Sequence, residues 1–198
     1  MESCVAGMYA AGELVGGANG ANRLSGNALP EALVFGERAG EAAARFAVRR
    51  KAPAWDKAAA TPHLEVIRAA RGRNGRRGIS PACLIAELKE LMWRKVGPFR
   101  TAAGLTEALD RIRGMREQDL PDAAVSGERV YNASLVEWFE LRSGLLAAEA
   151  LALSALNRRE SRGAHQRDDF PQTRSDYSRN QRLWLQGSAL GSSFAHPP

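Results

Sequence analysis

Residues 8–40, MYAAGELVGGANGANRLSGNALPEALVFGERAG, constrain the fold more than any other part of the chain. Residues 5–11 have the apolar character of a short buried strand, and residues 12–26 are a loop rich in Gly and Asn, which favour turns. A helix is predicted to begin near Asn27, with Pro30 in its first turn, where a missing N–H costs little. The segment therefore predicts a strand, a glycine-rich loop and a helix in succession.

This predicted helix has one apolar face. Its apolar residues recur at helical spacing, namely Leu29, Leu33, Ala39, Ala43, Phe46 and Ala47. Gly36 and Gly40 lie four residues apart, one turn along the helix. We therefore expect this face to pack closely against another part of the backbone.

Helical patterns dominate the second half of the chain. Ser80-Pro81 is predicted to begin a helix over 82–96, which Gly97-Pro98 ends, and further helices are predicted over 101–115 and 133–159. Trp93, Trp138 and Phe139 sit at helical spacing among apolar residues, so core packing is the expected role of all three. Residues 172–198 show little periodicity and are predicted to be irregular.

Between these halves lies a basic segment, residues 51–79, with a helical stretch predicted around 63–70. It contains the arginine-rich sequence RGRNGRRG, residues 71–78. Such a cluster is compatible with nucleic-acid binding. No aromatic residue interleaves it, so a solvated linker between domains is the favoured interpretation.

Composition excludes several classes of protein. The formal net charge is +6, which arginine-rich solvated helix faces or an anionic partner would explain. Cys4 and Cys83 are the two cysteines, too few for an iron–sulfur cluster held by this chain alone. The start of the chain lacks a signal-peptide pattern, and the apolar segment 144–156 is too short to span a bilayer and contains Glu149. We expect a cytoplasmic protein that reaches a membrane only through other subunits, without inserting itself.

Three motifs in one order resemble the C-terminal part of the succinate dehydrogenase/fumarate reductase flavoprotein family, which includes L-aspartate oxidase. They are GELVGGANGANRLSGNAL, ELKELMWRKVGPFRTAAGLTEAL and ELRSGLLAAEALALSALNRRESRGAHQRDDFP. The resemblance implies a mainly α fold, in which a strand-loop-helix remnant of an FAD-binding α/β domain precedes a helical bundle. The expected divisions are an FAD-binding segment (1–50), the basic linker (51–79), the family's C-terminal helical domain (80–171) and an irregular tail (172–198).

The resemblance also implies a site for FAD and a dicarboxylate. Backbone N–H groups of Ala28 and Leu29, at a helix N-terminus, would stabilise the negative charge of a reduced flavin. Glu13 would accept hydrogen bonds from ribityl or ribose hydroxyls. Arg23, whose planar fork suits a carboxylate, would hold the succinate- or fumarate-like substrate beside flavin N5. No catalytic residue and no metal ligand is assigned in this chain.

The chain departs from the family in two ways. Asn19 stands where many members carry a histidine, and Asn cannot become cationic. The family's N-terminal dinucleotide fold and capping domain are not found, so we expect this chain alone to hold an incomplete FAD site and to turn nothing over. A fragment, a split-gene product and a degenerate remnant all remain open.

The arginine-rich closing motif NRRESRGAHQR is open to two interpretations, an anion site or an ion-pair network that docks the helical domain. We favour the network, with Glu160 paired to Arg162 and Asp168 or Asp169 paired to Arg167. His165 is interpreted as structural, and His63 and His196 are expected to face solvent.

Two other functions are alternatives to the interpretation of this chain as part of an oxidoreductase. The first is a non-catalytic helical interaction module from residue 80 onward, and the second is a nucleic-acid-binding protein based on residues 71–78. Nucleic acid is the less favoured, because the charge excess is modest and no recognised binding motif accompanies it. The expected partners are a dicarboxylate substrate, the N-terminal flavoprotein half and an iron–sulfur subunit.

Overall fold

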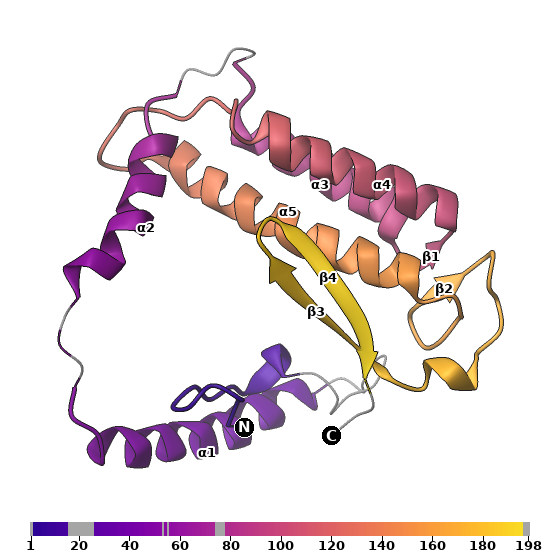
Figure 1. Ribbon diagram of the computed structural model, residues 1–198, viewed down its shortest axis with the longest axis horizontal. Coiled ribbons are helices and arrows are strands. Elements are labelled where there is room, and N and C mark those ends of the chain that lie inside the picture. Colours follow the sequence, from indigo (N-terminus) through magenta and orange to yellow (C-terminus); the bar gives the residue numbers. More distant parts are fainter. Residues whose placement is uncertain (1, 16–25, 53, 55, 74–77, 196–198) are drawn as a thin grey trace. The chain divides into compact units, whose positions relative to one another are not determined.

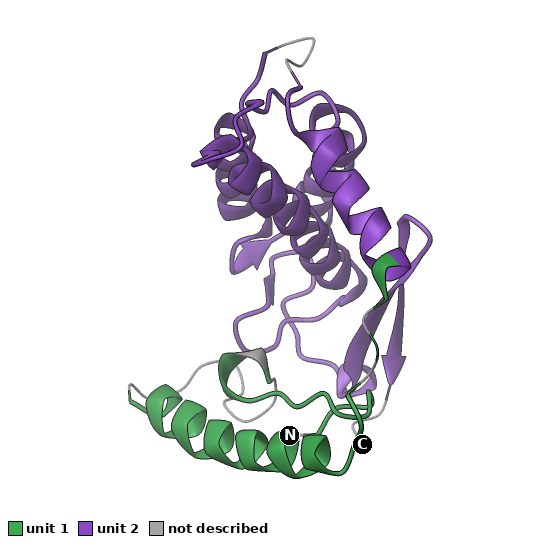
Figure 2. Cartoon of the chain, turned by 90° about the vertical axis from the view of Figure 1, so that its left-hand side faces the viewer, with its two compact units in different colours: residues 1–57 green, residues 58–198 purple. Residues whose placement is uncertain are grey.

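A computed structural model describes residues 2–15, 26–52, 54, 56–73 and 78–195 of the chain. The chain divides into two compact units, residues 1–57 and 58–198, coloured separately in Figure 2. The five α-helices that the described ranges contain confirm the predicted mainly α fold with a C-terminal helical bundle. Among the described residues, none of the helices combines the length and the apolarity that crossing a membrane requires.

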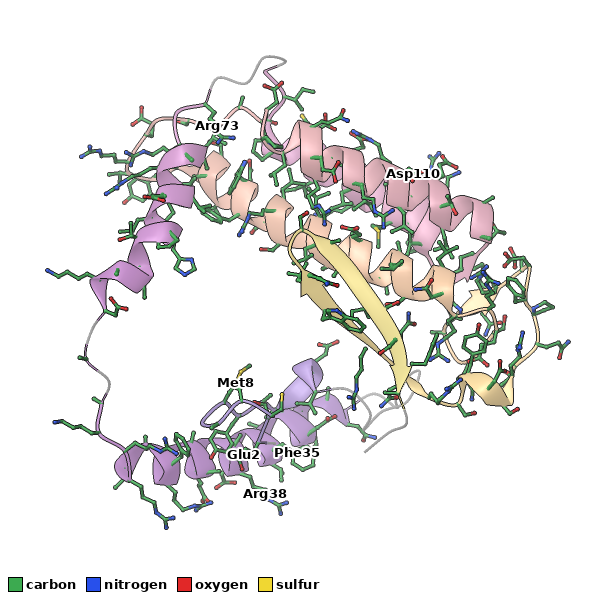
Figure 3. The ribbon with its side chains drawn as sticks, in the orientation of Figure 1. Glu2, Met8, Phe35, Arg38, Arg73 and Asp110 are labelled. Carbon is green, nitrogen blue, oxygen red and sulfur yellow. The ribbon has the colours of Figure 1, made fainter. Side chains whose placement is uncertain are left out.

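The first unit contains the short 3-10 helix Gly12–Leu14 and the long helix α1, Ala28–Val48. The predicted strand over residues 5–11 is wrong: these residues form a turn, closed by an isolated bridge between Glu2 and Tyr9. A lone apolar segment has no ladder of hydrogen bonds without a neighbouring strand, and Met8 is 53% exposed here (Figure 3).

The apolar face of α1 is largely uncovered within its unit. Leu29 and Leu33 are more than two-thirds exposed, and Phe35 is also exposed (Figure 3). A Cβ atom built on Gly36 or Gly40 would meet no atom within 4 Å. The close packing expected at these two glycines is therefore not made within the described part of the chain.

The second unit is built on three helices that pack against one another: α3 (Pro81–Val96), α4 (Ala102–Gly114) and α5 (Ala133–Asn157), seen together in Figure 1. Each begins with a side-chain cap, from Ser80, Thr101 and Asn132 respectively, which accepts a hydrogen bond from a backbone N–H of the first turn. The predicted Ser80-Pro81 helix start is thus confirmed.

The core of this unit lies between the three helices. Its fully buried apolar side chains include Leu105, Ile112, Met115, Leu141 and Leu145. A π-helical turn, Met115–Asp119, extends α4, and the indole N–H of Trp138 donates to the Leu120 carbonyl at 3.0 Å. Core burial is confirmed for Trp138, whereas the prediction for Trp93 is wrong, since it is 76% exposed.

Helix α2 (Lys57–Ala70) occupies the predicted linker and is longer than expected. Arg73, from the arginine-rich cluster, donates to the backbone carbonyls of Pro121 (2.6 Å) and Ala69. This arginine therefore braces the backbone, while residues 74–77 of the cluster lie outside the described residues.

In the part of the chain that the structure describes, four strands form two small sheets. Strands β1 (Phe99–Arg100) and β2 (Gln166–Arg167) pair in parallel, which joins the chain after α3 to the chain after α5. Strands β3 (Asn180–Gln186) and β4 (Ala189–Ala195) form an antiparallel hairpin, in the segment predicted to be irregular. The two-residue turn between them contains Gly187 at φ +65°, a conformation that such hairpin turns require.

Candidate functional site

The Gly-Glu turn is fixed against α1. Gly12 has φ +79° and is buried, and a Cβ atom there would lie 3.7 Å from the Cβ of Ala32. The turn is closed by a hydrogen bond from the Val15 N–H to the Gly12 carbonyl at 2.9 Å. Glu13 follows on this turn and is exposed, so its carboxylate can accept hydrogen bonds from a ligand.

Helix α1 begins at Ala28, one turn before Ala32. Asn27 has helical φ and ψ angles and its side chain makes no capping hydrogen bond, contrary to the predicted cap. The Leu29 N–H donates to the Gly26 carbonyl at 3.3 Å, a long bond, and Leu29 itself is exposed. The first turn carries the positive end of the helix dipole, which favours an anionic group nearby.

The N-terminal segment makes a second contact with α1 further along the helix. The Tyr9 and Phe46 rings meet edge to face, with centroids 6.5 Å apart, and Gly7 lies against Phe46. The segment before Glu13 is therefore anchored near the end of α1, and the Glu13 turn is anchored near its beginning. The structure thus places Glu13, Ala28 and Leu29 in the same part of the first unit.

Arg23 and Asn19 lie outside the described residues, so the predicted substrate arginine has no observed position. His196 lies outside them too, whereas His63 is exposed as expected. Among the described residues, His, Cys, Asp and Glu nowhere gather in a group of three that could hold a metal ion.

The closing motif forms a buried ion network around Glu160, whose side chain is fully buried. Its carboxylate accepts from Arg162 (2.9 Å), from Arg158 (2.6 Å) and from the backbone N–H of Arg174 (2.8 Å). Burial alone would raise the pKa of Glu160, but these hydrogen bonds, led by that of Arg162, outweigh it and lower the pKa to about 2. The predicted Glu160–Arg162 pair is confirmed, and Arg174 is a partner that sequence reasoning missed.

A second pair, Arg167 with Asp169, links two helix ends. The guanidinium binds the Asp169 carboxylate through two hydrogen bonds of 2.7 and 2.8 Å, and donates to the carbonyls of Ala155 and Leu156 at the end of α5. The same carboxylate accepts from the N–H of Ala102, the first residue of α4, at 2.8 Å. A cation therefore sits at the negative end of α5 and an anion at the positive end of α4. The Arg167–Asp169 pair thus connects the end of α5 to the start of α4. Asp169 rather than Asp168 is the partner of Arg167.

His165 belongs to the same network. Its Nε2 lies 3.0 Å from the Arg158 carbonyl, and because a carbonyl oxygen only accepts, Nε2 carries the proton. Burial, followed by the charges of Arg100, Arg167 and Arg158, lowers the pKa of His165 despite this bond. A neutral, hydrogen-bonded imidazole agrees with the structural role predicted for it.

The network predicts a loss of stability in acid. Because the pKa of Glu160 is lower in the folded chain than its usual 4.5, its stabilising contribution is fully present above about pH 4.5 and is lost as the pH falls toward 2. We expect the urea midpoint of the chain to decrease between pH 5 and pH 3, the range estimated from this shift.

Glu160→Gln should lower that midpoint at neutral pH and flatten its decrease in acid. Asp176→Asn is the matched control, since Asp176 pairs with Arg174 at the surface. A decrease in acid that is unchanged in Glu160→Gln would contradict the assignment.

The comparisons with known proteins match this architecture. The family model described as fumarate reductase flavoprotein C-term matches residues 85–195. The chain is 40% identical over 171 residues to the fumarate reductase flavoprotein subunit of Mycobacterium tuberculosis, covering 83% of this chain and 29% of that protein. It is 34% identical over 191 residues to an uncharacterised FAD-dependent oxidoreductase of Methanocaldococcus jannaschii, covering 93% of this chain and 34% of that protein.

The fold is shared as well. The Mycobacterium smegmatis Sdh1 complex in the apo form contains a chain that superposes with a TM-score of 0.82 and 34% identity, covering 94% of this chain and 32% of that one. The chain thus spans about a third of the length of the proteins it matches. Because the family model, the identities and the fold agree, the chain belongs to the fumarate reductase/succinate dehydrogenase flavoprotein family, of which it carries the C-terminal portion.

Proposed function

We propose that this chain supplies the closing wall of a flavin site in an FAD-dependent oxidoreductase of the fumarate reductase/succinate dehydrogenase type. Hydride would pass between flavin N5 and a carbon of a succinate- or fumarate-like dicarboxylate. FAD supplies the hydride chemistry when bound, and this chain's residues orient and polarise the flavin and the substrate. Arg23 holds a substrate carboxylate, Glu13 accepts from the cofactor's hydroxyls, and the α1 N-terminus stabilises negative charge on the flavin.

The observation that carries the proposal is the packing of the Gly12 turn on Ala32 of α1. The turn that carries the exposed Glu13 thus packs on α1 one helical turn after its first residue, an arrangement that supports a site for a ligand with hydroxyl groups and a developing negative charge. The uncovered face of α1 supports the companion proposal that an FAD-binding and capping portion completes the site. An iron–sulfur subunit is the proposed electron partner, and a cytoplasmic location with membrane attachment through partners stays a prediction.

A chimera tests this function directly. In it, the present chain replaces the matching C-terminal part of the Mycobacterium tuberculosis flavoprotein subunit, which is 40% identical. We expect the purified chimera to carry FAD and to reduce fumarate with an artificial electron donor, and the isolated chain to do neither. A folded chimera that carries no flavin would contradict the proposal.

Glu13→Gln is expected to lower the chimera's affinity for FAD. The amide keeps the size of the side chain but removes a charged acceptor, and hydrogen bonds to charged groups contribute enough for about a tenfold effect. The measurement is FAD retention during dialysis, followed by flavin absorbance. Glu37→Gln, an exposed carboxylate further along α1, is the control and should retain FAD like the parent.

A further inference from the structure

Helices α3 and α5 leave an open apolar groove between them, with a volume of about 650 Å³. It is lined mainly by apolar side chains, among them Leu88, Met92, Trp93, Ala147 and Leu151. Lys89 and Glu140 are its charged lining residues. With so few polar groups, the groove suits apolar side chains better than a polar small molecule.

Two large aromatic side chains are exposed at the end of α3 and just beyond it. Trp93, in the groove, is 76% exposed, and Phe99, on β1, is 73% exposed. Each aromatic side chain removes about 150–250 Å² from water when it is buried, so leaving both in solvent forgoes a large stabilisation. An exposed tryptophan in an apolar groove is typical of a surface that another protein segment covers.

Arg100, next to Phe99 in the sequence, has no partner for its charge among the residues that the structure describes. Its Nε atom is buried and makes no hydrogen bond, and no ion pair or side-chain hydrogen bond is formed between Arg100 and any other described residue. Burial and the neighbouring charge of Arg167 lower the pKa of Arg100. A half-buried guanidinium of this kind is destabilising until an anion reaches it.

We propose that the α3–α5 surface, defined as the apolar groove including Trp93, is the docking face for the portion of the flavoprotein that this chain does not span. That portion places apolar side chains in the groove against Trp93 and an Asp or Glu carboxylate on Arg100. This inference rests on the proposed function.

Two arguments favour this occupant. The apolar groove with its exposed Trp93 suits a polypeptide better than a free anion, because aromatic residues are usual anchors of protein interfaces. The matched chains are about three times as long as this one, so the remaining two-thirds of such a polypeptide is tethered nearby at a high effective concentration.

Oxidative footprinting with mass spectrometry measures the exposure of each residue in the isolated 198-residue chain and in the chimera. We expect hydroxyl radicals to modify Trp93 and Phe99 readily in the isolated chain and about tenfold more slowly in the chimera, as interface burial implies. Tyr131, which is fully exposed and outside the groove, is the internal control and should react equally in both. Equal modification of Trp93 in both proteins would overturn the proposal.

Matched variants give a second readout. Arg100→Gln should leave the isolated chain as stable or more stable, because it removes an unpaired, desolvated charge. In the chimera the same change should lower the folding equilibrium constant by about 30-fold, the effect of losing an interface anchor. Arg142→Gln, an equal charge change at an exposed position of α5, should have little effect in either protein. A similar effect of Arg100→Gln in both proteins would count against docking.

Other occupants give distinct results. Protection of Trp93 that grows with the concentration of the isolated chain would replace the proposal with a second copy of this chain. Protection only after a separate iron–sulfur subunit is added would assign the surface to that subunit. A chimera that carries FAD and reduces fumarate with Trp93 unprotected would refute only the docking surface. A chimera with Trp93 protected but without flavin would refute only the proposed function.

Discussion

Replacing Arg167 with alanine is expected to lower the free energy of unfolding of the second unit by about 3 kcal/mol, because a fully buried side chain and its charge-assisted hydrogen bonds are lost. Arg167 is 1% exposed and binds Asp169 through two hydrogen bonds. Its loss would also leave the carbonyls of Ala155 and Leu156 without this donor at the end of α5. The measurement is urea unfolding of the isolated chain followed by circular dichroism.

Two further variants test whether the loss of stability in Arg167→Ala comes from the burial and the hydrogen-bond geometry of Arg167. Arg167→Lys keeps the charge but loses the planar fork, so it should fall between the parent and the alanine variant. Arg174→Ala breaks an ion pair with Asp176 in which both side chains are about half exposed, and should cost less than about 1 kcal/mol. If Arg167→Ala and Arg174→Ala lowered the free energy of unfolding equally, the Arg167–Asp169 pair would stabilise the fold no more than a surface ion pair does.

Arg23→Ala is expected to decrease kcat/KM of the chimera for fumarate by at least about 30-fold, since truncating one partner of a buried charge pair costs 2 kcal/mol or more. The flavin should remain bound, because Arg23 is proposed to hold the substrate carboxylate rather than the cofactor. Arg23→Lys should restore only part of the activity, because an ammonium group cannot bind a carboxylate through a fork.

Arg38→Ala is the control for the loss of one positive charge, since Arg38 is an exposed residue of α1 (Figure 3). It should leave both flavin content and kcat/KM unchanged. If Arg23→Ala retained full turnover with flavin bound, another group would have to hold the substrate, and the assignment of Arg23 would be wrong.

The helical unit was largely predictable from local signals. Ser80-Pro81 and Gly97 bound α3 as expected, because capping and helix ending depend on neighbouring residues alone. The Glu160–Arg162 pair was also predictable, because the two residues lie two positions apart in the sequence. These features need no knowledge of the tertiary fold.

The errors arose where tertiary packing decides. Trp93 shares the helical spacing of apolar residues that face the core, yet it lies on the open side of α3, and periodicity does not distinguish a core face from an interface. The strand predicted over residues 5–11 has no partner strand among the described residues of its unit. The β3–β4 hairpin was missed although Gly187-Ser188 is a two-residue turn of a kind that joins antiparallel strands.

The structure gives positions for only some of the residues predicted to contact a ligand. Glu13, Ala28 and Leu29 lie in the same part of the first unit, and their role toward a cofactor stays a prediction. Asn27 does not cap α1, because a cap needs extended backbone angles and this residue is helical. Arg23 lies outside the described residues, so its role rests on the resemblance and on the chemistry of the guanidinium.

The central claim is that this chain completes a flavin site that exchanges hydride with a dicarboxylate. Anaerobic addition of succinate to the FAD-loaded chimera, followed by stopped-flow absorbance of the oxidised flavin, tests it most directly. We expect the oxidised-flavin band to disappear with the parent chimera and to disappear at least about 30-fold more slowly with Arg23→Ala. A flavin-loaded chimera whose band is unaffected by succinate and also unaffected by fumarate after chemical reduction would contradict it.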